Sequence, residues 1–124
     1  MPMSQNVTSD SLKYYLTTTS VSARPTTWTV SLHTGDPGAA GTDNEVTDSA
    51  YARQNITFSV TGQVAANASL VTFPAAVLAY NVSHVVVWGG ATPVVVQALR
   101  TIKSIAPGVQ ATIAAGELTV GGSA

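Results

Sequence analysis

The sequence contains no cysteine and few charged residues. The absence of cysteine excludes disulfides, thiolate chemistry and cysteine-based zinc sites. Charged residues make up 9% of the 124 residues, against about a quarter in a typical soluble protein. The formal net charge is −1, so there is no basic excess to neutralise phosphates, and we expect no nucleic acid as a direct ligand.

Long apolar runs and targeting signals are also missing. No stretch approaches the roughly 18 apolar residues that suggest a membrane span, so no membrane is expected as a partner. The start, Met1-Pro2-Met3-Ser4, has neither the basic region nor the apolar core of a signal peptide. Because weakly charged surfaces rich in valine and threonine tend to associate, we expect partners to cover much of this one.

What the sequence does contain is a series of short strands separated by turn signals. Trp28, Val30 and Leu32 alternate with polar residues, which predicts a first strand over residues 26–33 with one buried face. An almost continuously apolar run at 82–88 predicts a central strand, paired in a hairpin with 94–100. We expect both valine runs to be interior or covered by a subunit. The other expected strands cover residues 51–60, 69–73 (ended by Pro74), 109–113 and 117–120, with 101–108 crossing between strands.

These strands predict an all-β fold, an antiparallel β-sandwich of jelly-roll type with a short N-terminal helix or arm. We expect one domain: an arm and helix over 1–24, the sandwich over 25–121 and a flexible tail at 122–124. Leu12, Tyr15 and Leu16 form one apolar stripe on the helix, which Ser9 or Asp10 would cap. Such a short helix is marginal alone, so we expect it to dock on the sheet or on another subunit.

The loop after the first strand concentrates acidic residues. Four of the six acids fall between residues 36 and 48, namely Asp36, Asp43, Glu45 and Asp48. Oxygen ligands on a loop suit calcium, so these four are candidate metal ligands, although their spacing fits no EF-hand. The interpretation we favour is that Glu45 or Asp36 pairs with Arg53 and holds the loop against the sheet edge.

Catalytic and cofactor sites are not expected. His33 and Asp36 flank a turn and His84 lies elsewhere, but no nucleophile motif accompanies them, so a Ser/His/Asp hydrolase remains a remote alternative. His33 is expected to form local hydrogen bonds on the polar face of its strand. We therefore predict no catalytic residues, no cofactor and no small-molecule substrate.

The aromatic residues divide into core and surface candidates. Trp28 and Trp88 lie inside apolar strands, so we expect core packing rather than a platform for sugar rings. Tyr51 and Tyr80 lie at strand ends or loops, where tyrosine often anchors an interface.

Several stretches resemble a group of small bacteriophage virion proteins. The likeness covers about residues 8 to 120 and rests on Leu32-His33-Thr34-Gly35-Asp36-Pro37-Gly38, Asn44-Glu45-Val46, Tyr51-Ala52-Arg53-Gln54, Val71-Thr72-Phe73-Pro74, Val82-Ser83-His84-Val85-Val86-Val87-Trp88 and Ala115-Gly116-Glu117-Leu118-Thr119-Val120. Proteins of this group are usually labelled tail fibre or minor tail proteins. The chain departs from the pattern at Gly89-Gly90, where the family often has Asp-Ala, so any role of that acid is absent.

The resemblance implies a non-enzymatic structural protein of the virion, made in the cytoplasm of the bacterial host. It would be tail- or fibre-associated and would bind copies of itself and other virion proteins; closed rings such as trimers are expected, because cyclic symmetry closes such surfaces. The alternatives are a capsid cement or decoration protein and a receptor- or glycan-binding module. The absence of heptads argues against a coiled-coil fibre shaft. The interface candidates are Leu12, Tyr15, Leu16, Asp36, Glu45, Tyr51, Arg53 and Tyr80.

Overall fold

The computed structural model describes residues 5–20 and 24–121, so the start of the expected arm and the expected tail lie outside the described residues. Within that part, one helix precedes a series of strands, which confirms the expected all-β class. The elements are α1 (Gln5–Leu16), β1 (Trp28–His33), β2 (Gln54–Asn55), β3 (Phe58–Thr61), β4 (Val64–Asn67), β5 (Val71–Ala75), β6 (Tyr80–Gly89), β7 (Thr92–Ile105), β8 (Gln110–Ile113) and β9 (Thr119–Gly121).

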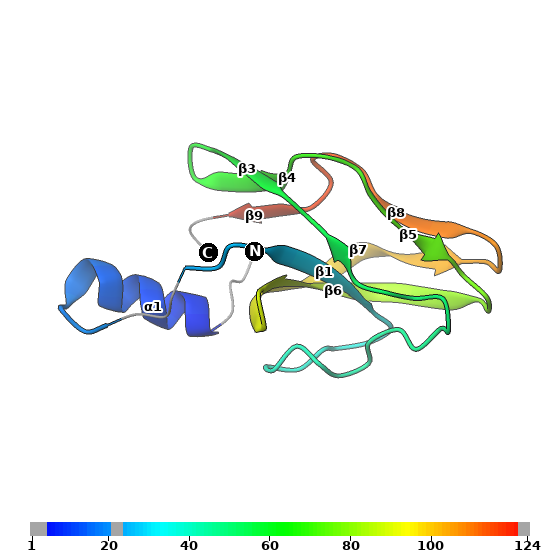
Figure 1. Cartoon of the computed structure of the whole chain (residues 1–124), viewed down its shortest axis with the longest axis horizontal. Coiled ribbons are helices and arrows are strands. Elements are labelled where there is room, and N and C mark those ends of the chain that lie inside the picture. The colour runs from blue at the N-terminus through cyan, green and yellow to red at the C-terminus, as the bar shows by residue number, and fades with distance from the viewer. Residues whose placement is uncertain (1–4, 21–23, 122–124) are drawn as a thin grey trace.

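The strands form two layers (Figure 1). One layer is a four-stranded antiparallel sheet in the order β2-β1-β6-β7, hereafter sheet A. The other contains the three-stranded sheet β3-β4-β9 and the two-stranded sheet β5-β8, both antiparallel. The jelly-roll connection remains a prediction.

The hairpin of β6 and β7 is confirmed, and β6 is interior to its sheet. The expected strand 94–100 is too short, because β7 continues to Ile105 through the segment expected to cross between strands. Its pairing with β6 shifts between Val82 and His84, so β7 bulges there and continues beyond the bulge. Because β7 lies at the end of the strand order, its valine run is not interior to the sheet, and its cover by a subunit remains a prediction.

Two further strand boundaries differ from the prediction. The expected strand 51–60 is divided into β2 and β3, because Ile56 N–H bonds Trp28 C=O while β3 pairs with β4. Pro74 lies within β5 rather than ending it. The β5–β8 pairing is irregular between Thr72 and Ala75, so the missing N–H of proline breaks no regular ladder.

The core lies between the two layers. Sheet A contributes Val30, Leu32, Val82, Val85, Val87 and Val95, and the opposite layer and its connections contribute Val71, Phe73, Ala111, Ile113 and Leu118. The Tyr51 ring packs parallel to Phe73 at 6.1 Å between centroids. Burying these apolar side chains is the main stabilising contribution to the fold.

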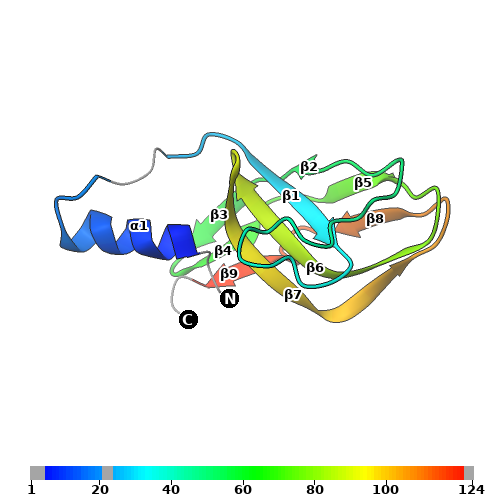
Figure 2. The same ribbon diagram turned by 90° about the horizontal axis from the view of Figure 1, so that it is seen from below.

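Both faces of β1 are buried, so the prediction of one exposed polar face is wrong. Ser31 and His33 are as inaccessible as Val30. The loop 34–48, hereafter the cover loop, lies across the outer face of sheet A (Figure 2). Val46 N–H bonds Leu32 C=O, and Thr34 N–H bonds Asn44 C=O. Alternation within the strand cannot reveal a cover that comes from elsewhere in the chain.

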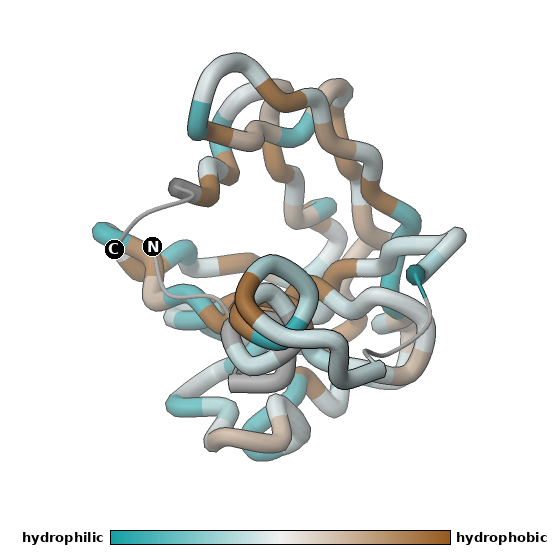
Figure 3. The backbone as a smooth tube through the Cα atoms, turned by 90° about the vertical axis from the view of Figure 1, so that its left-hand side faces the viewer, coloured by the Kyte–Doolittle hydropathy of each residue, from teal (hydrophilic) through white to brown (hydrophobic). Residues whose placement is uncertain are grey.

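The helix begins earlier than expected and meets sheet A at β7, with its largest side chains left exposed. It starts at Gln5, so neither Ser9 nor Asp10 is its cap; the intervening residues have only modestly unfavourable helix propensities. It ends where the threonine run begins, with the Thr17 hydroxyl bonding Lys13 C=O at 2.9 Å. Figure 3, seen from the helix end, shows α1 in front of the sheets. No helix in the described ranges is long and apolar enough to cross a membrane.

Candidate functional site

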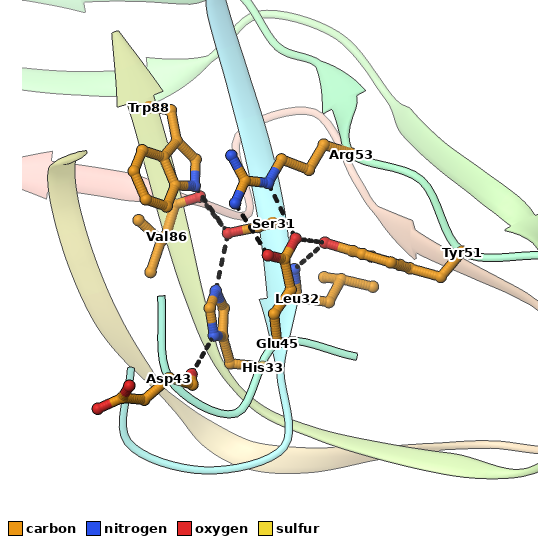
Figure 4. Close-up of polar contacts among 9 residues, drawn as sticks. All are labelled: Ser31, Leu32, His33, Asp43, Glu45, Tyr51, Arg53, Val86 and Trp88. Atoms are coloured by element: carbon orange, nitrogen blue, oxygen red, sulfur yellow. Dashed lines mark hydrogen bonds and ion pairs between the residues drawn. The ribbon is translucent and has the colours of Figure 1, made fainter. Parts of the chain in front are cut away.

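A chain of buried hydrogen bonds holds the cover loop on sheet A (Figure 4). His33 Nδ1 lies 2.7 Å from the Asp43 carbonyl oxygen, which can only accept, so Nδ1 carries the proton. His33 Nε2 then accepts from the Ser31 hydroxyl at 2.8 Å. Ser31 Oγ in turn accepts the Trp88 indole N–H at 2.9 Å. The chain links β1, β6 and the cover loop, with one defined place for each proton.

This environment keeps His33 neutral. Burial lowers the pKa of the imidazole, and the nearby Arg53 and His84 lower it further, against the opposing effects of the Asp43 carbonyl and Glu45. Ser31 and His33 have no exposed surface. A Ser–His pair without access to solvent cannot attack a substrate.

The remaining members of the imagined hydrolase arrangement are elsewhere. The Asp36 carboxylate accepts the Gly38 N–H at 3.0 Å, which stabilises the turn. His84 Nδ1 lies 2.8 Å from Ser83 Oγ. The structure therefore does not assemble a Ser/His/Asp site from these residues.

Glu45 joins the cover loop to the segment before β2. Arg53 donates two hydrogen bonds to its carboxylate, at 2.9 Å from Nε and 2.8 Å from Nη2, which confirms one of the two expected pairings. The Tyr51 hydroxyl donates to the same carboxylate at 2.6 Å and accepts Leu32 N–H at 3.0 Å. The Arg53 guanidinium also lies 4.3 Å from the centre of the Trp88 ring, a cation–π contact.

The protonation equilibria follow from this geometry. The hydrogen bonds from Arg53 and Tyr51 lower the pKa of Glu45, although burial opposes them. Burial and the carboxylate of Glu45 raise the pKa of Tyr51. Glu45 is therefore ionised and Tyr51 protonated at neutral pH, which keeps the hydrogen bonds in place.

The four acids of the calcium hypothesis do not converge. Asp36 is committed to its turn, Glu45 to Arg53 and Tyr51, and Asp43 is exposed. Asp48 accepts the N–H groups of Val77 at 3.1 Å and Leu78 at 2.8 Å. Across residues 5–20 and 24–121, no group of three His, Asp or Glu side chains could hold a metal ion.

The apolar residues near the end of α1 are uncovered. The exposed fractions are 55% for Leu12, 67% for Tyr14, 80% for Tyr15 and 74% for Leu16. The rings of Tyr14 and Tyr15 meet edge to face, with centroids 4.9 Å apart. The stripe of Leu12, Tyr15 and Leu16, hereafter the helix tip, is an apolar surface that the described body leaves open.

A second open surface lies where β6 begins. Val77 and Leu78 expose 54% and 71% of their surface. Beside them is a cleft of about 540 Å³, lined by Val46, Thr47, Asp48, Leu78 and Tyr80 among others. Partial burial and the nearby Asp48 raise the pKa of the Tyr80 hydroxyl. This region is hereafter the loop-end cleft.

The predicted interface residues thus fall into separate places. Leu12, Tyr15 and Leu16 form the helix tip; Glu45, Tyr51 and Arg53 form an internal clamp; Glu45 and Tyr80 also line the loop-end cleft. Asp36 lies in none of these three places. The sequence interpretation missed Leu78 and the buried chain through Ser31 and Trp88, because both depend on contacts between distant segments.

The tryptophans do not form an exposed platform. Trp88 is buried, and Trp28 is half-buried and packs against the core. The expectation of core packing is confirmed for Trp28, whereas Trp88 is buried beneath the cover loop, against Ser31, Gly41 and Arg53.

Comparison with known proteins gives a family for the chain. No curated protein sequence matches it. The family model described as "Podophage GP4 fiber I protein gp80" matches residues 2–121, nearly the whole chain. The match agrees with the resemblance to phage tail fibre proteins. The chain therefore belongs to the podophage GP4 fiber I protein gp80 family, a family of phage fibre proteins associated with the virion.

Proposed function

We propose that this protein is a fibre-associated structural component of a phage tail that works by binding copies of itself and neighbouring virion proteins. The family supplies the general role in the virion. The surfaces of the molecule supply the means: an open helix tip, an open cleft and few charges to keep copies apart.

The helix tip is the observation that carries this proposal. A helix of twelve residues is marginal in water unless an apolar face is packed against something. The described body leaves four large apolar side chains of α1 uncovered. Contact with another protein would bury them, and burial of apolar surface is the usual driving force for association.

Capsid cement or decoration remains an alternative use of the same surfaces. It would differ in location and copy number rather than in chemistry. A head location would be shown by antibody labelling of intact particles, and labelling at the tail would support the role proposed here.

The helix tip can be tested with a combined Leu12→Ser, Tyr15→Ser and Leu16→Ser variant. We expect the unmodified chain to sediment as an oligomer and the variant to sediment as a monomer. Leu70→Ser is the matched control, because Leu70 is an exposed leucine of the body. Equal incorporation of the unmodified chain and the variant into particles, together with a monomeric unmodified chain, would contradict the proposal.

A further inference from the structure

The loop-end cleft lies at the opposite end of the molecule from the helix tip. Figure 1 and Figure 2 both place α1 at one end of the long axis and the connection between β5 and β6 at the other. The connection carries Val77 and Leu78, two of the exposed large apolar residues of the body. The molecule therefore has an apolar surface at each end.

The exposed leucine is held on a fixed backbone. The two carboxylate oxygens of Asp48 accept the successive N–H groups of Val77 and Leu78, and one of them also accepts Ala50 N–H at 3.2 Å. These hydrogen bonds lower the pKa of Asp48, so it is ionised at neutral pH. A side chain presented on an ordered loop loses less conformational entropy on binding than one on a mobile loop.

The cleft beside Leu78 has the composition of a protein-binding surface. Its lining combines apolar side chains, among them Leu78, Val46 and the ring of Tyr80, with polar ones such as Thr47 and Asn44. Protein–protein interfaces likewise combine apolar and polar contacts. Tyrosine in an interface commonly contributes much of the binding free energy.

The charges of the two ends are complementary. Residues 36–48 carry four acids and no base, and two of these acids, Glu45 and Asp48, line the cleft. Arg53 offsets the charge of Glu45, whereas Asp48 accepts only backbone N–H groups and keeps its negative charge there. Residues 5–27 carry Lys13, Arg24 and Asp10, a net charge of +1. Lys13 is exposed and lies within the helix tip sequence, between Leu12 and Tyr14.

We infer that the loop-end cleft receives the helix tip of a second copy of this chain, so that copies associate head to tail. The inference rests on the proposed self-association and assigns it a second surface. Leu12, Tyr15 and Leu16 of one copy would cover Leu78 and Tyr80 of the next, with Lys13 beside the acidic side chains of the cleft. A contact between two different surfaces of the same chain generates a ring where the rotation closes and a filament where it does not.

Two variants with complementary defects test this contact. Tyr15→Ser with Leu16→Ser removes the helix tip and keeps the cleft, whereas Leu78→Ser alters the cleft and keeps the helix tip. Each is expected to weaken self-association at least about tenfold, the effect of losing a central apolar anchor. An equimolar mixture of the two should form a one-to-one heterodimer, because one intact helix tip and one intact cleft remain. Leu70→Ser is again the control.

The outcomes separate this inference from the proposal beneath it. Restoration of dimers in the mixture, together with a weaker contact in a Lys13→Glu variant, supports head-to-tail binding. If Leu78→Ser assembles like the unmodified chain and the helix variant does not, the helix tip binds another helix tip or a different surface. The inference is then wrong, while self-association stands. An unmodified chain that is monomeric at all concentrations overturns both.

Discussion

Each ring nitrogen of His33 has a hydrogen-bond partner, and for the neutral ring these partners allow only one arrangement of protons. The carbonyl of Asp43 requires a proton on Nδ1, and the Ser31 hydroxyl supplies one to Nε2. Protonation would turn Nε2 into a donor facing a hydroxyl that already accepts the Trp88 N–H. The hydroxyl would then have to donate to the Val86 carbonyl, 3.4 Å away, which is a long contact. At the scale of one residue, the neutral ring is part of what holds the cover loop.

A first prediction concerns the pH dependence of stability. The pKa of His33 is lowered in the folded chain, so the unfolded chain binds its proton more readily. Stability from this group is therefore complete above the ordinary value of 6.5 and is lost as the pH falls below it. Between pH 7 and pH 5, the free energy of unfolding measured in urea should decrease in the unmodified chain, and this decrease should be absent in His33→Gln.

The same substitution has a cost at neutral pH. It disturbs buried partners on both sides of the ring, which typically costs about 1–3 kcal/mol. His84→Gln is the matched control, because His84 faces His33 across the β1–β6 pairing but is not fully buried. If the free energy of unfolding of His33→Gln falls with pH as steeply as that of the unmodified chain, other groups cause the acid sensitivity.

A second prediction concerns the pair of Glu45 and Arg53. Its geometry is bidentate, but the side chains are 23% and 37% exposed, so solvent screens the attraction. A double-mutant cycle with Glu45→Gln and Arg53→Gln should give a coupling of about 1 kcal/mol at pH 7. The pKa of Glu45 is lowered, so its contribution is present above the ordinary value of 4.5 and is lost as the pH falls below it. A cycle on Lys103 and Glu117, another paired and partly exposed couple, provides the comparison.

At the scale of elements, the cover loop packs closely against sheet A at Gly41. The backbone there has φ = 74°, and an added Cβ would lie 3.2 Å from Pro93 and Val86 and 3.4 Å from Trp88. A glycine at this position allows both the left-handed conformation and the close approach. Its neighbours belong to β6 and β7, which ties the loop to the central hairpin.

A third prediction uses two glycines to separate these requirements. Gly62 also has a positive φ, 62°, but an added Cβ would meet nothing within 4 Å. Gly62→Ala should therefore show only backbone strain, about 1–2 kcal/mol. Gly41→Ala should lower the free energy of unfolding by about 1–3 kcal/mol more, because the packed loop must move away from the sheet. Equal losses in urea unfolding would mean that the loop packs loosely.

A fourth prediction concerns α1. The helix touches the body chiefly at β7, and its largest side chains are uncovered. Deletion of residues 1–20 should therefore leave the unfolding free energy of the monomeric body within about 0.5 kcal/mol of its original value, the usual range for surface changes. The same deletion should abolish oligomers in sedimentation. A large loss of stability in the monomer would show that the helix packs on its own body.

The elements show where sequence patterns suffice. Continuous apolar residues predicted β6 as interior and its hairpin with β7, because burial on both faces needs no knowledge of distant segments. The patterns failed for β1, where Ser31 and His33 are buried by a loop. For α1 they identified the apolar stripe but not its partner, because a 3.6-residue period says nothing about a surface to receive it.

At the scale of the whole molecule, the same distinction applies to the candidate site. The pairing of an acid of this loop with Arg53 was predictable, since Arg53 is the basic residue nearest in sequence to the four acids between residues 36 and 48. The anchoring of Leu78 was not, because it depends on Asp48, thirty residues earlier in the chain. Which surfaces stay open is a property of the folded chain as a whole.

The cover loop has a consequence for how a particle could be built from this protein. Sheet A presents its inner face to the core, and its outer face over β1 and β6 is closed by residues of the same chain. The cover loop thus stands between β1 and β6 and any neighbour that approaches that broad face. A filament of such units would grow by addition at its two ends, as a thin fibre requires.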